Sequence, residues 1–290
     1  MNEKKGNDMR HLFVTDMDGT LLGRDSLVSA RSAEIVSRLS REGVPVTVAT
    51  ARTPATVEVL LENTYINIPA IVMTGAALWD RAAQRYTDVM YPRAEAVARV
   101  MECCRKGGVN PFVYVLRDDA MLEVYHNGRM NSREWKFYEE RCGLTRKRFI
   151  FDDPHASDGP MEGTVLIFAV GEGRGIEAVA SELAGDARLS VSCYRDIFNQ
   201  EVAYMEVFAG GVSKAAAIRR LARRIGADRV TVYGDNLNDL PMFAVADEAV
   251  AVANAMPGVG EKADRRIGAN YEDAVALDIA MCVRADGLRG

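Results

Sequence analysis

Asp16-Met17-Asp18-Gly19-Thr20 is the stretch that decides the fold of this chain. It follows an apolar run at residues 12–14 and precedes Leu21-Leu22, so two carboxylates come directly after a short buried strand. In open α/β folds, the residues at the carboxyl ends of the strands form the ligand site. Two aspartates at such a place can divide a reaction, because one stays ionised and attacks while the other carries a proton.

The residues around this stretch alternate between strand and helix patterns. We expect strands over residues 11–15, 44–49 and 70–73, and helices over 30–41 and 54–63, the second beginning at Pro54. This order predicts a parallel sheet with right-handed crossovers. The same alternation returns later in the chain, with helices expected over 213–225, 237–245 and 272–283 and strands over 229–233 and 249–253.

The middle of the chain has a different pattern, with longer helices and pairs of alternating strands. We expect helices over 94–106, 131–141 and 175–183, strands over 112–116, 121–126, 164–170, 189–194 and 202–208, and a polar loop over 151–163. The predicted fold class is therefore α/β, with a Rossmann-like core of mostly parallel sheet and an inserted α+β domain. The core would comprise residues 1–84 and 206–290, and the inserted domain residues 85–205.

Composition limits the classes of partner. The chain has 290 residues, of which 48% are apolar and 27% charged, and its formal net charge is -5. These values are typical of a globular protein and do not favour a nucleic-acid or membrane partner. The five cysteines include no Cys-x-x-Cys, and the first eight residues do not resemble a signal peptide, so we expect reduced thiols in the cytoplasm. The oligomeric state stays open.

Three further segments fall at expected strand ends or helix starts: Thr50, Lys214, and Asp235 within Gly234-Asp235-Asn236-Leu237-Asn238-Asp239. An ionised carboxylate that attacks a phosphate ester must overcome charge repulsion, which a divalent cation offsets. Mg2+ suits this task because it takes oxygen ligands from one or two carboxylates and keeps waters and phosphate oxygens as the rest. Asp16 and Asp235 can supply the carboxylates, and the backbone carbonyl of Asp18 a third ligand. Lys214 offers a positive charge and Thr50 a hydroxyl donor to the phosphate.

Each of these segments also has a structural explanation when taken alone. A pair of aspartates after a strand can form a turn or a cap, and a threonine there is usually a helix N-cap. A lysine at a helix start is usually solvated. Their joint occurrence, in this order along successive elements, is what favours catalysis.

On these motifs the chain resembles the Cof-type branch of the haloacid dehalogenase superfamily, phosphatases with a C2B cap inserted after the third core strand. The resemblance implies that Asp16 is phosphorylated, that Asp18 is general acid and then base, and that Asp235 binds Mg2+. Two segments depart from the usual pattern, since Met73-Thr74-Gly75 replaces an Asn-Gly pair and Thr50-Ala51-Arg52 replaces Thr-Gly-Arg. The residues implied to support the site or bind substrate are Gly19, Arg52, Thr74, Gly75, Asn238 and Asp239.

The predicted function is Mg2+-dependent hydrolysis of small phosphorylated metabolites, such as sugar phosphates, through an aspartyl-phosphate at Asp16. A phosphotransferase or phosphomutase would use the same motifs and stays open as an alternative. A dehalogenase is disfavoured because it needs neither Asp18 nor a cation at Asp235. A phospho-accepting signalling domain is disfavoured because Met73-Thr74-Gly75 supplies no carboxylate after the third strand. A non-catalytic binding protein is disfavoured because every catalytic position holds a competent side chain.

Three features of the inserted domain need interpretation. Gly171-Glu172-Gly173-Arg174-Gly175 lacks the last glycine of a dinucleotide fingerprint, because Ile176 stands there, and we expect a loop. Residues 133–138 are expected to form an amphipathic helix that covers its own sheet. The domain should also contact the leaving group; the candidates by chemistry are Tyr114, Arg117, Asn127, Arg129 and Arg195, although packing explains each of them as well.

Overall fold

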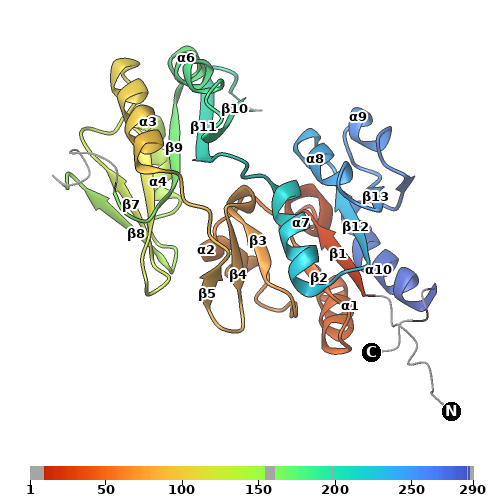
Figure 1. The fold of residues 1–290 in the computed structure, drawn as a ribbon. Helices are drawn as coiled ribbons and strands as arrows, with labels where there is room; N and C mark the ends of the chain where they lie inside the picture. Colours follow the sequence, from red (N-terminus) through yellow and green to blue (C-terminus); the bar gives the residue numbers. More distant parts are fainter. Residues whose placement is uncertain (1–9, 154–160, 197–198, 286, 288–290) are drawn as a thin grey trace. The chain divides into compact units, whose positions relative to one another are not determined.

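The computed structural model describes residues 10–153, 161–196, 199–285 and 287 (Figure 1). The chain divides into two compact units, one of residues 1–83 with 213–290 and one of residues 84–212. The predicted boundary between 205 and 206 falls inside a strand of the second unit, Val202–Ala209. We call residues 84–212 the inserted unit and the remainder the core unit.

The core unit is built on a five-stranded sheet in which every strand pair is parallel, as predicted. The chain's first strand lies inside the sheet, between one strand that follows it and one from the C-terminal part of the chain. An isolated parallel bridge from Ala49 to Ile71 continues the sheet toward the third predicted strand. The order is β14 (Arg265–Arg266), β13 (Glu248–Ala251), β12 (Arg229–Gly234), β1 (His11–Thr15) and β2 (Val46–Val48).

Helices cover this sheet with their apolar faces, and their bounds are α1 (Ala30–Arg41), α2 (Pro54–Leu60), α7 (Lys214–Ile225), α8 (Leu240–Phe243), α9 (Pro257–Gly260) and α10 (Ala274–Ala285). The core cluster includes Leu12 and Val14 from β1, Val232 from β12, and Ile218 and Leu221 from α7. Helix α1 begins where its Ser29 N-cap accepts a hydrogen bond from the Ser32 amide.

The single helix predicted over 237–245 is wrong. A 3-10 turn, η3 (Leu237–Asp239), comes first, and α8 follows it. Pro241 explains the break, because proline has no amide to donate and is tolerated only in the first turn of a helix.

A second, three-stranded sheet has the order β3 (Ala70–Val72), β4 (Ala77–Asp80) and β5 (Arg85–Thr87). Only β3 was predicted. The turn between β3 and β4 is η2 (Met73–Gly75), and the stretch after β1 is η1 (Met17–Leu21). A last short turn, η4 (Asn270–Glu272), precedes α10.

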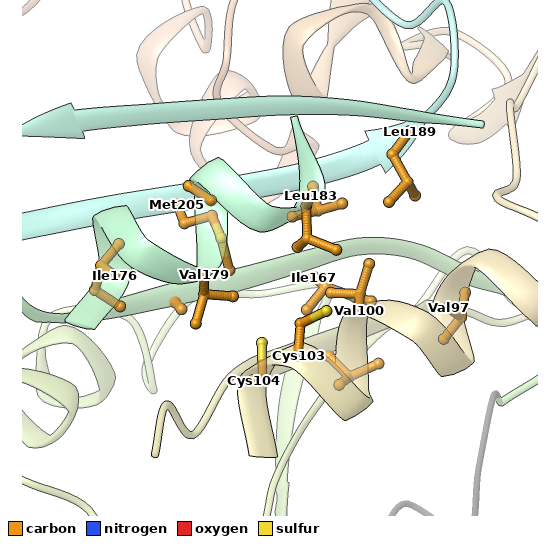
Figure 2. Packing of buried hydrophobic residues seen from close by; sticks show 14 of the residues in the cluster. Val97, Val100, Cys103, Cys104, Ile167, Ile176, Val179, Leu183, Leu189 and Met205 are labelled. Carbon is orange, nitrogen blue, oxygen red and sulfur yellow. The ribbon is translucent and has the colours of Figure 1, made fainter. Parts of the chain in front are cut away.

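The inserted unit is α+β, with a six-stranded sheet of mainly antiparallel pairs. Helices α3 (Ala94–Lys106) and α6 (Gly173–Leu183) pack on one face of it, where Val100, Cys103 and Val179 meet Ile167 and Met205 (Figure 2). The sheet order is β10 (Leu189–Arg195), β11 (Val202–Ala209), β9 (Thr164–Glu172), β6 (Phe112–Leu116), β7 (Leu122–His126) and β8 (Lys147–Phe151).

In the inserted unit one strand was missed, and one predicted loop is wrong. Strand β8 was missed, and the polar loop predicted over 151–163 lies partly outside the described residues, which resume at 161. The loop expected at Gly171–Gly175 does not form, because β9 extends to Glu172 and α6 begins at Gly173.

The helix predicted around residues 133–138 is confirmed as α4 (Ser132–Glu139). Phe137 stacks on Phe168 with ring centroids 4.5 Å apart and lies 4.9 Å from Phe112, so α4 covers the sheet face opposite α3 and α6. Within the described residues, no helix is long and apolar enough to cross a membrane.

Candidate active site

The two aspartates of the first and fourth motifs lie side by side because their strands are neighbours. Thr15 of β1 pairs with Tyr233 of β12, and the Asp16 amide donates a hydrogen bond to the Tyr233 carbonyl at 3.0 Å. Asp235 follows β12 directly. Since the two strands are parallel, Asp16 and Asp235 both lie at the carboxyl edge of the sheet, where ligands bind in this class of fold.

Lys214 joins the site from the first turn of α7. Its Nζ donates to Asp16 Oδ1 at 2.5 Å and to Asp239 Oδ1 at 2.9 Å, and the residue is only 6% exposed. Ser213 caps the helix by accepting from the Ala216 amide, which fixes where Lys214 emerges. Burial lowers the pKa of Lys214, but Asp16 and Asp239 outweigh that effect and raise it, so the lysine stays a cation.

Burial governs the protonation of the two aspartates. It raises the pKa of Asp16 to about 7, because Lys214 offsets only part of the desolvation and Asp239 and Asp235 add repulsion. Burial likewise raises the pKa of Asp235 to about 6, although Thr20 Oγ1 donates to its Oδ1 at 2.7 Å. The carboxylates of Asp16, Asp235 and Asp239 therefore carry more negative charge than the single ammonium of Lys214 neutralises.

The acidic groups fit a hard divalent cation. Carboxylate oxygens of Asp16, Asp235 and Asp239 lie within 4.8 Å of one another. Asp239 uses both oxygens internally, one for Lys214 and one for the amides of Asp235 and Asn236 at 3.1 and 3.2 Å. Asp16 and Asp235 each keep one oxygen that accepts no hydrogen bond from the described residues. Of these three aspartates, Asp16 and Asp235 therefore have a carboxylate oxygen available to a hard cation such as Mg2+, whereas Asp239 does not.

Asp18 lies in the turn after Asp16 and is held by the second motif. Arg52 Nε donates to its Oδ2 at 2.8 Å and Nη2 to its Oδ1 at 2.6 Å, a two-point pair. The Asp18 side chain is about half exposed, so it can meet solvent and substrate.

Thr50 and the η2 turn lie next to each other. The buried Thr50 accepts at Oγ1 from the Arg52 amide at 3.1 Å, and its carbonyl accepts from the Thr74 amide at 3.0 Å. Thr74 has a φ of +57° and a buried hydroxyl that finds no partner among the described residues. A Cβ on Gly75 would overlap the backbone of Ser213, so this glycine lets η2 reach the start of α7.

One predicted residue makes no hydrogen bond to the others, and two residues that contact them were missed. Asn238 is exposed and makes no hydrogen bond to the described residues. Thr20 was missed although it lies inside the opening stretch. Asn254 was also missed; it donates to the Gly19 carbonyl at 2.8 Å and accepts from the Asn270 amide at 2.9 Å. The signal for Asn254 was its place just after a predicted strand.

The five residues of the inserted unit that were candidates to contact the leaving group differ in burial and in hydrogen-bond partners. Arg117 pairs with Glu123 at 2.6 Å, and Arg195 with Glu177 at 2.6 Å, so packing within the unit explains both. Asn127 donates to the Asp153 carbonyl, Arg129 is exposed, and Tyr114 is buried in the sheet.

Comparison with known proteins identifies the family of the chain. The haloacid dehalogenase-like hydrolase family matches residues 13–279. The chain belongs to this family. It is 26% identical over 270 residues to the 5-amino-6-(5-phospho-D-ribitylamino)uracil phosphatase YcsE of Bacillus subtilis, which covers 92% of this chain and 94% of that protein. It is 23% identical over 271 residues to the pyridoxal phosphate phosphatase YbhA of Escherichia coli, at 91% and 96% coverage.

The solved structures show the same fold. A haloacid dehalogenase-like hydrolase from Bacteroides thetaiotaomicron superposes with a TM-score of 0.74 at 22% identity, covering 94% of this chain and 99% of that one. The predicted fold class and the predicted membership of the Cof-type branch are confirmed. The prediction of an enzyme, a phosphatase of the haloacid dehalogenase superfamily, is confirmed at the level of family and enzyme class.

Proposed function

We propose that this protein is a Mg2+-dependent phosphomonoester hydrolase that works through an aspartyl-phosphate at Asp16. The observation that carries the proposal is the set of contacts around Asp16. One of its oxygens is held at 2.5 Å by the buried Lys214, while the other accepts no hydrogen bond from the described residues and lies in the acidic cluster with Asp235. A carboxylate so held has one oxygen oriented by a fixed cation and the other available for attack.

The reaction would proceed in two displacements. Asp16 attacks phosphorus, the bond from phosphorus to the ester oxygen breaks, and Asp18 gives its proton to the departing alcohol. Asp18, now a carboxylate, takes a proton from water, and that water attacks the aspartyl-phosphate to release inorganic phosphate and restore Asp16. Lys214 and the Thr50 hydroxyl would stabilise the charge on the transferring group. Arg52 orients Asp18 through two hydrogen bonds, one to each carboxylate oxygen.

Asp16 and Asp235, together with the backbone carbonyl of Asp18, would hold Mg2+. When bound, the ion offsets the repulsion between the Asp16 carboxylate and the phosphate. Gly19 and Thr20 keep Asp235 in place for this role, and Asp239 keeps Lys214 in place.

We further propose that the inserted unit is a cap that selects small phosphorylated metabolites. The support comes from the names of two relatives, which hydrolyse a phosphoribityl compound and pyridoxal phosphate. A cytoplasmic location suits the five cysteines, because their spacing offers no disulfide framework.

The test is phosphate release from a panel of phosphomonoesters, with Mg2+ and with EDTA, for the wild type and Asp16→Asn. Turnover that needs both Mg2+ and Asp16 supports the proposal. A folded protein that hydrolyses no ester in Mg2+ would overturn the hydrolase and leave the phosphotransferase, which differs only in requiring an acceptor alcohol in place of water.

A further inference from the structure

Strand β10 lies at one end of the six-stranded sheet of the inserted unit (Figure 1). One of its edges pairs with β11, and the other pairs with no strand of the described residues. The pairing with β11 continues past both ends of β10, because the Gly210 amide donates to the Arg188 carbonyl at 2.7 Å and the Asp196 amide donates to the Val202 carbonyl at 3.0 Å. Residues 188–196 therefore follow β11 in a single register.

The backbone of β10 presents unpaired polar groups along its outer edge. In an antiparallel pair, successive residues turn their backbone groups alternately toward the partner strand and away from it. Arg188 and Asp196 turn theirs toward β11, so the amides and carbonyls of Val191 and Cys193 point away from the sheet. Within the described parts of the chain these groups accept and donate no hydrogen bond. Such an edge is a template on which another strand can pair.

Other edge strands of this protein carry charges that oppose such pairing. Strand β8, at the opposite end of the same sheet, begins with Lys147-Arg148, and β14, at an end of the core sheet, is Arg265-Arg266. Charged side chains on an edge strand disfavour its association with another chain. Strand β10 has seven residues, and residues 189–194 include no charge, no proline and no glycine. It is therefore a long edge without these protecting features.

A groove runs beside this edge, between β10 and α6. It has a volume of about 340 Å3, and its lining includes Ala180, Ser181 and Ala184 from α6 and Val191 and Cys193 from β10. Ser181, Ala184 and Cys193 are exposed. Because the distance between packed helices depends on the side chains at their contact, small residues on this side of α6 allow another helix to come close.

A second copy of β10 matches this edge in both geometry and hydrogen bonding. If all seven residues pair antiparallel with their counterparts, the two-fold axis passes through Ser192. Val191 of each copy then lies opposite Cys193 of the other, and each such pair exchanges both backbone hydrogen bonds. The groups that point outward are thus the groups that meet. The same surface is used on both copies, so the assembly closes as a dimer.

The same register brings opposite charges together at both ends of the paired strands. Arg188 and Asp196 lie equally far from Ser192, so each Arg188 faces Asp196 of the other copy. They occupy a position without mutual backbone hydrogen bonds, where opposed side chains are closest, and opposite charges there stabilise the pairing. Within one copy Arg188 pairs with Asp186 at 2.6 Å and Asp196 accepts from the Tyr204 hydroxyl at 2.9 Å, which holds each charge at its end of the strand.

We propose that two copies of this chain associate through β10, antiparallel about a two-fold axis at Ser192. The sheets of the two inserted units join into one continuous sheet, and the two α6 helices lie beside each other on the same face of it. The groove beside each β10 receives the small side chains of the other copy's α6. This association does not depend on the proposed function, and its test needs no catalytic activity.

The first experiment measures molar mass by light scattering and the dimer Kd by sedimentation, from about 1 to 100 μM chain. We expect twice the chain mass of 31.8 kDa at the upper end. Cys193→Pro removes an outward amide and leaves the bonds to β11, because proline is tolerated on the open side of an edge strand. It should raise the dimer Kd by about 100-fold or more. Cys193→Ser, which keeps the amide and the size, is the matched control and should change the Kd by less than about 3-fold. Far-UV circular dichroism checks that both variants fold.

The second experiment tests the register by cross-linking and does not depend on the proline variant. In a background of Cys142→Ser and Cys193→Ser, Ser192→Cys places two thiols opposite each other, with Cα atoms about 4.5 Å apart, close enough for a disulfide. Oxidation should give a covalent dimer on a non-reducing gel, whereas Ser190→Cys, which faces Tyr194, should give none. A monomer at every concentration, a Kd that Cys193→Pro leaves unchanged, or equal cross-linking at 190 and 192 would each overturn the proposal.

Discussion

Replacing Gly19 with alanine places a methyl group against a predicted cation ligand. Gly19 has a φ of +77°, and a Cβ at this position would overlap Asp235 Oδ2 and lie 2.8 Å from its Cγ. Asp235 cannot withdraw freely, because its Oδ1 accepts from the Thr20 hydroxyl at 2.7 Å. The substitution therefore strains the backbone and displaces one carboxylate of the acidic cluster.

The expected cost has two parts. A non-glycine residue in the left-handed region loses about 1–2 kcal/mol, and overpacking a filled site costs about 1–3 kcal/mol. We expect Gly19→Ala to lower the free energy of unfolding by about 2–5 kcal/mol. Because misplacing a catalytic group by about 1 Å can cost about 100-fold, kcat/KM should fall by about that factor and the Mg2+ concentration for half activity should rise.

Gly43→Ala is the matched control. Gly43 also has a positive φ, +93°, but a Cβ there would meet nothing within 4 Å. It should lose only the backbone part, about 1–2 kcal/mol, and keep full activity. Urea unfolding followed by far-UV circular dichroism measures stability, and phosphate release against Mg2+ concentration measures the site. If Gly19→Ala and Gly43→Ala lose the same stability and keep the same activity at each Mg2+ concentration, the close approach of Gly19 to Asp235 does not matter for the site.

Three further substitutions test separate parts of the molecule. Burial and the charge of Arg141 lower the pKa of Lys147 from 10.5 to about 8. Between those two pH values the unfolded chain binds more protons than the folded chain, so the folded state becomes more stable as pH rises. Urea unfolding at each pH should therefore show the wild type gaining about 3 kcal/mol relative to Lys147→Met across this window. Parallel curves for the two proteins would show that Lys147 is not buried as a cation. Tyr233→Phe removes a hydroxyl that donates to the buried Asp278 at 2.8 Å and should cost about 1–2 kcal/mol in the same assay, whereas an unchanged midpoint would argue against that bond. Arg52→Lys cannot donate to both Asp18 oxygens at once, so kcat/KM should fall about 10-fold. The free energy of unfolding should change by less than about 1 kcal/mol, because the pair is partly exposed. A larger loss of stability would point to a structural role for Arg52.

Long, strongly patterned elements could be predicted from the sequence to the residue. Strand β1, helix α1 and helix α3 have the predicted bounds because their apolar residues repeat with the period of one structure over a whole element. Strands β4 and β5 were missed. Each has at most four residues, which are too few to show a strand pattern of their own.

The site shows the same division. Asp16 and Asp235 could be placed together from sequence, because both directly follow strands of one parallel sheet. The side-chain partners could not. Thr20 reaches Asp235 across 215 positions and Asn254 reaches the Gly19 carbonyl across 235, and short polar side chains of these types have many local explanations. Asn238 lies exposed in the 3-10 turn, and its supporting role stays a prediction.

The balance of charge connects the fold to the proposed chemistry. Three carboxylates lie within 4.8 Å of one another, and a single ammonium, that of Lys214, is bonded to two of them. Taken ionised, this set carries two negative charges more than it balances, in a place where burial already raises the pKa values of Asp16 and Asp235. A phosphate ester would be repelled from such a site, whereas a divalent cation would bring it to neutrality. The buried lysine alone supplies too little positive charge for an anion site, and this deficit supports the proposal that a divalent cation completes the site.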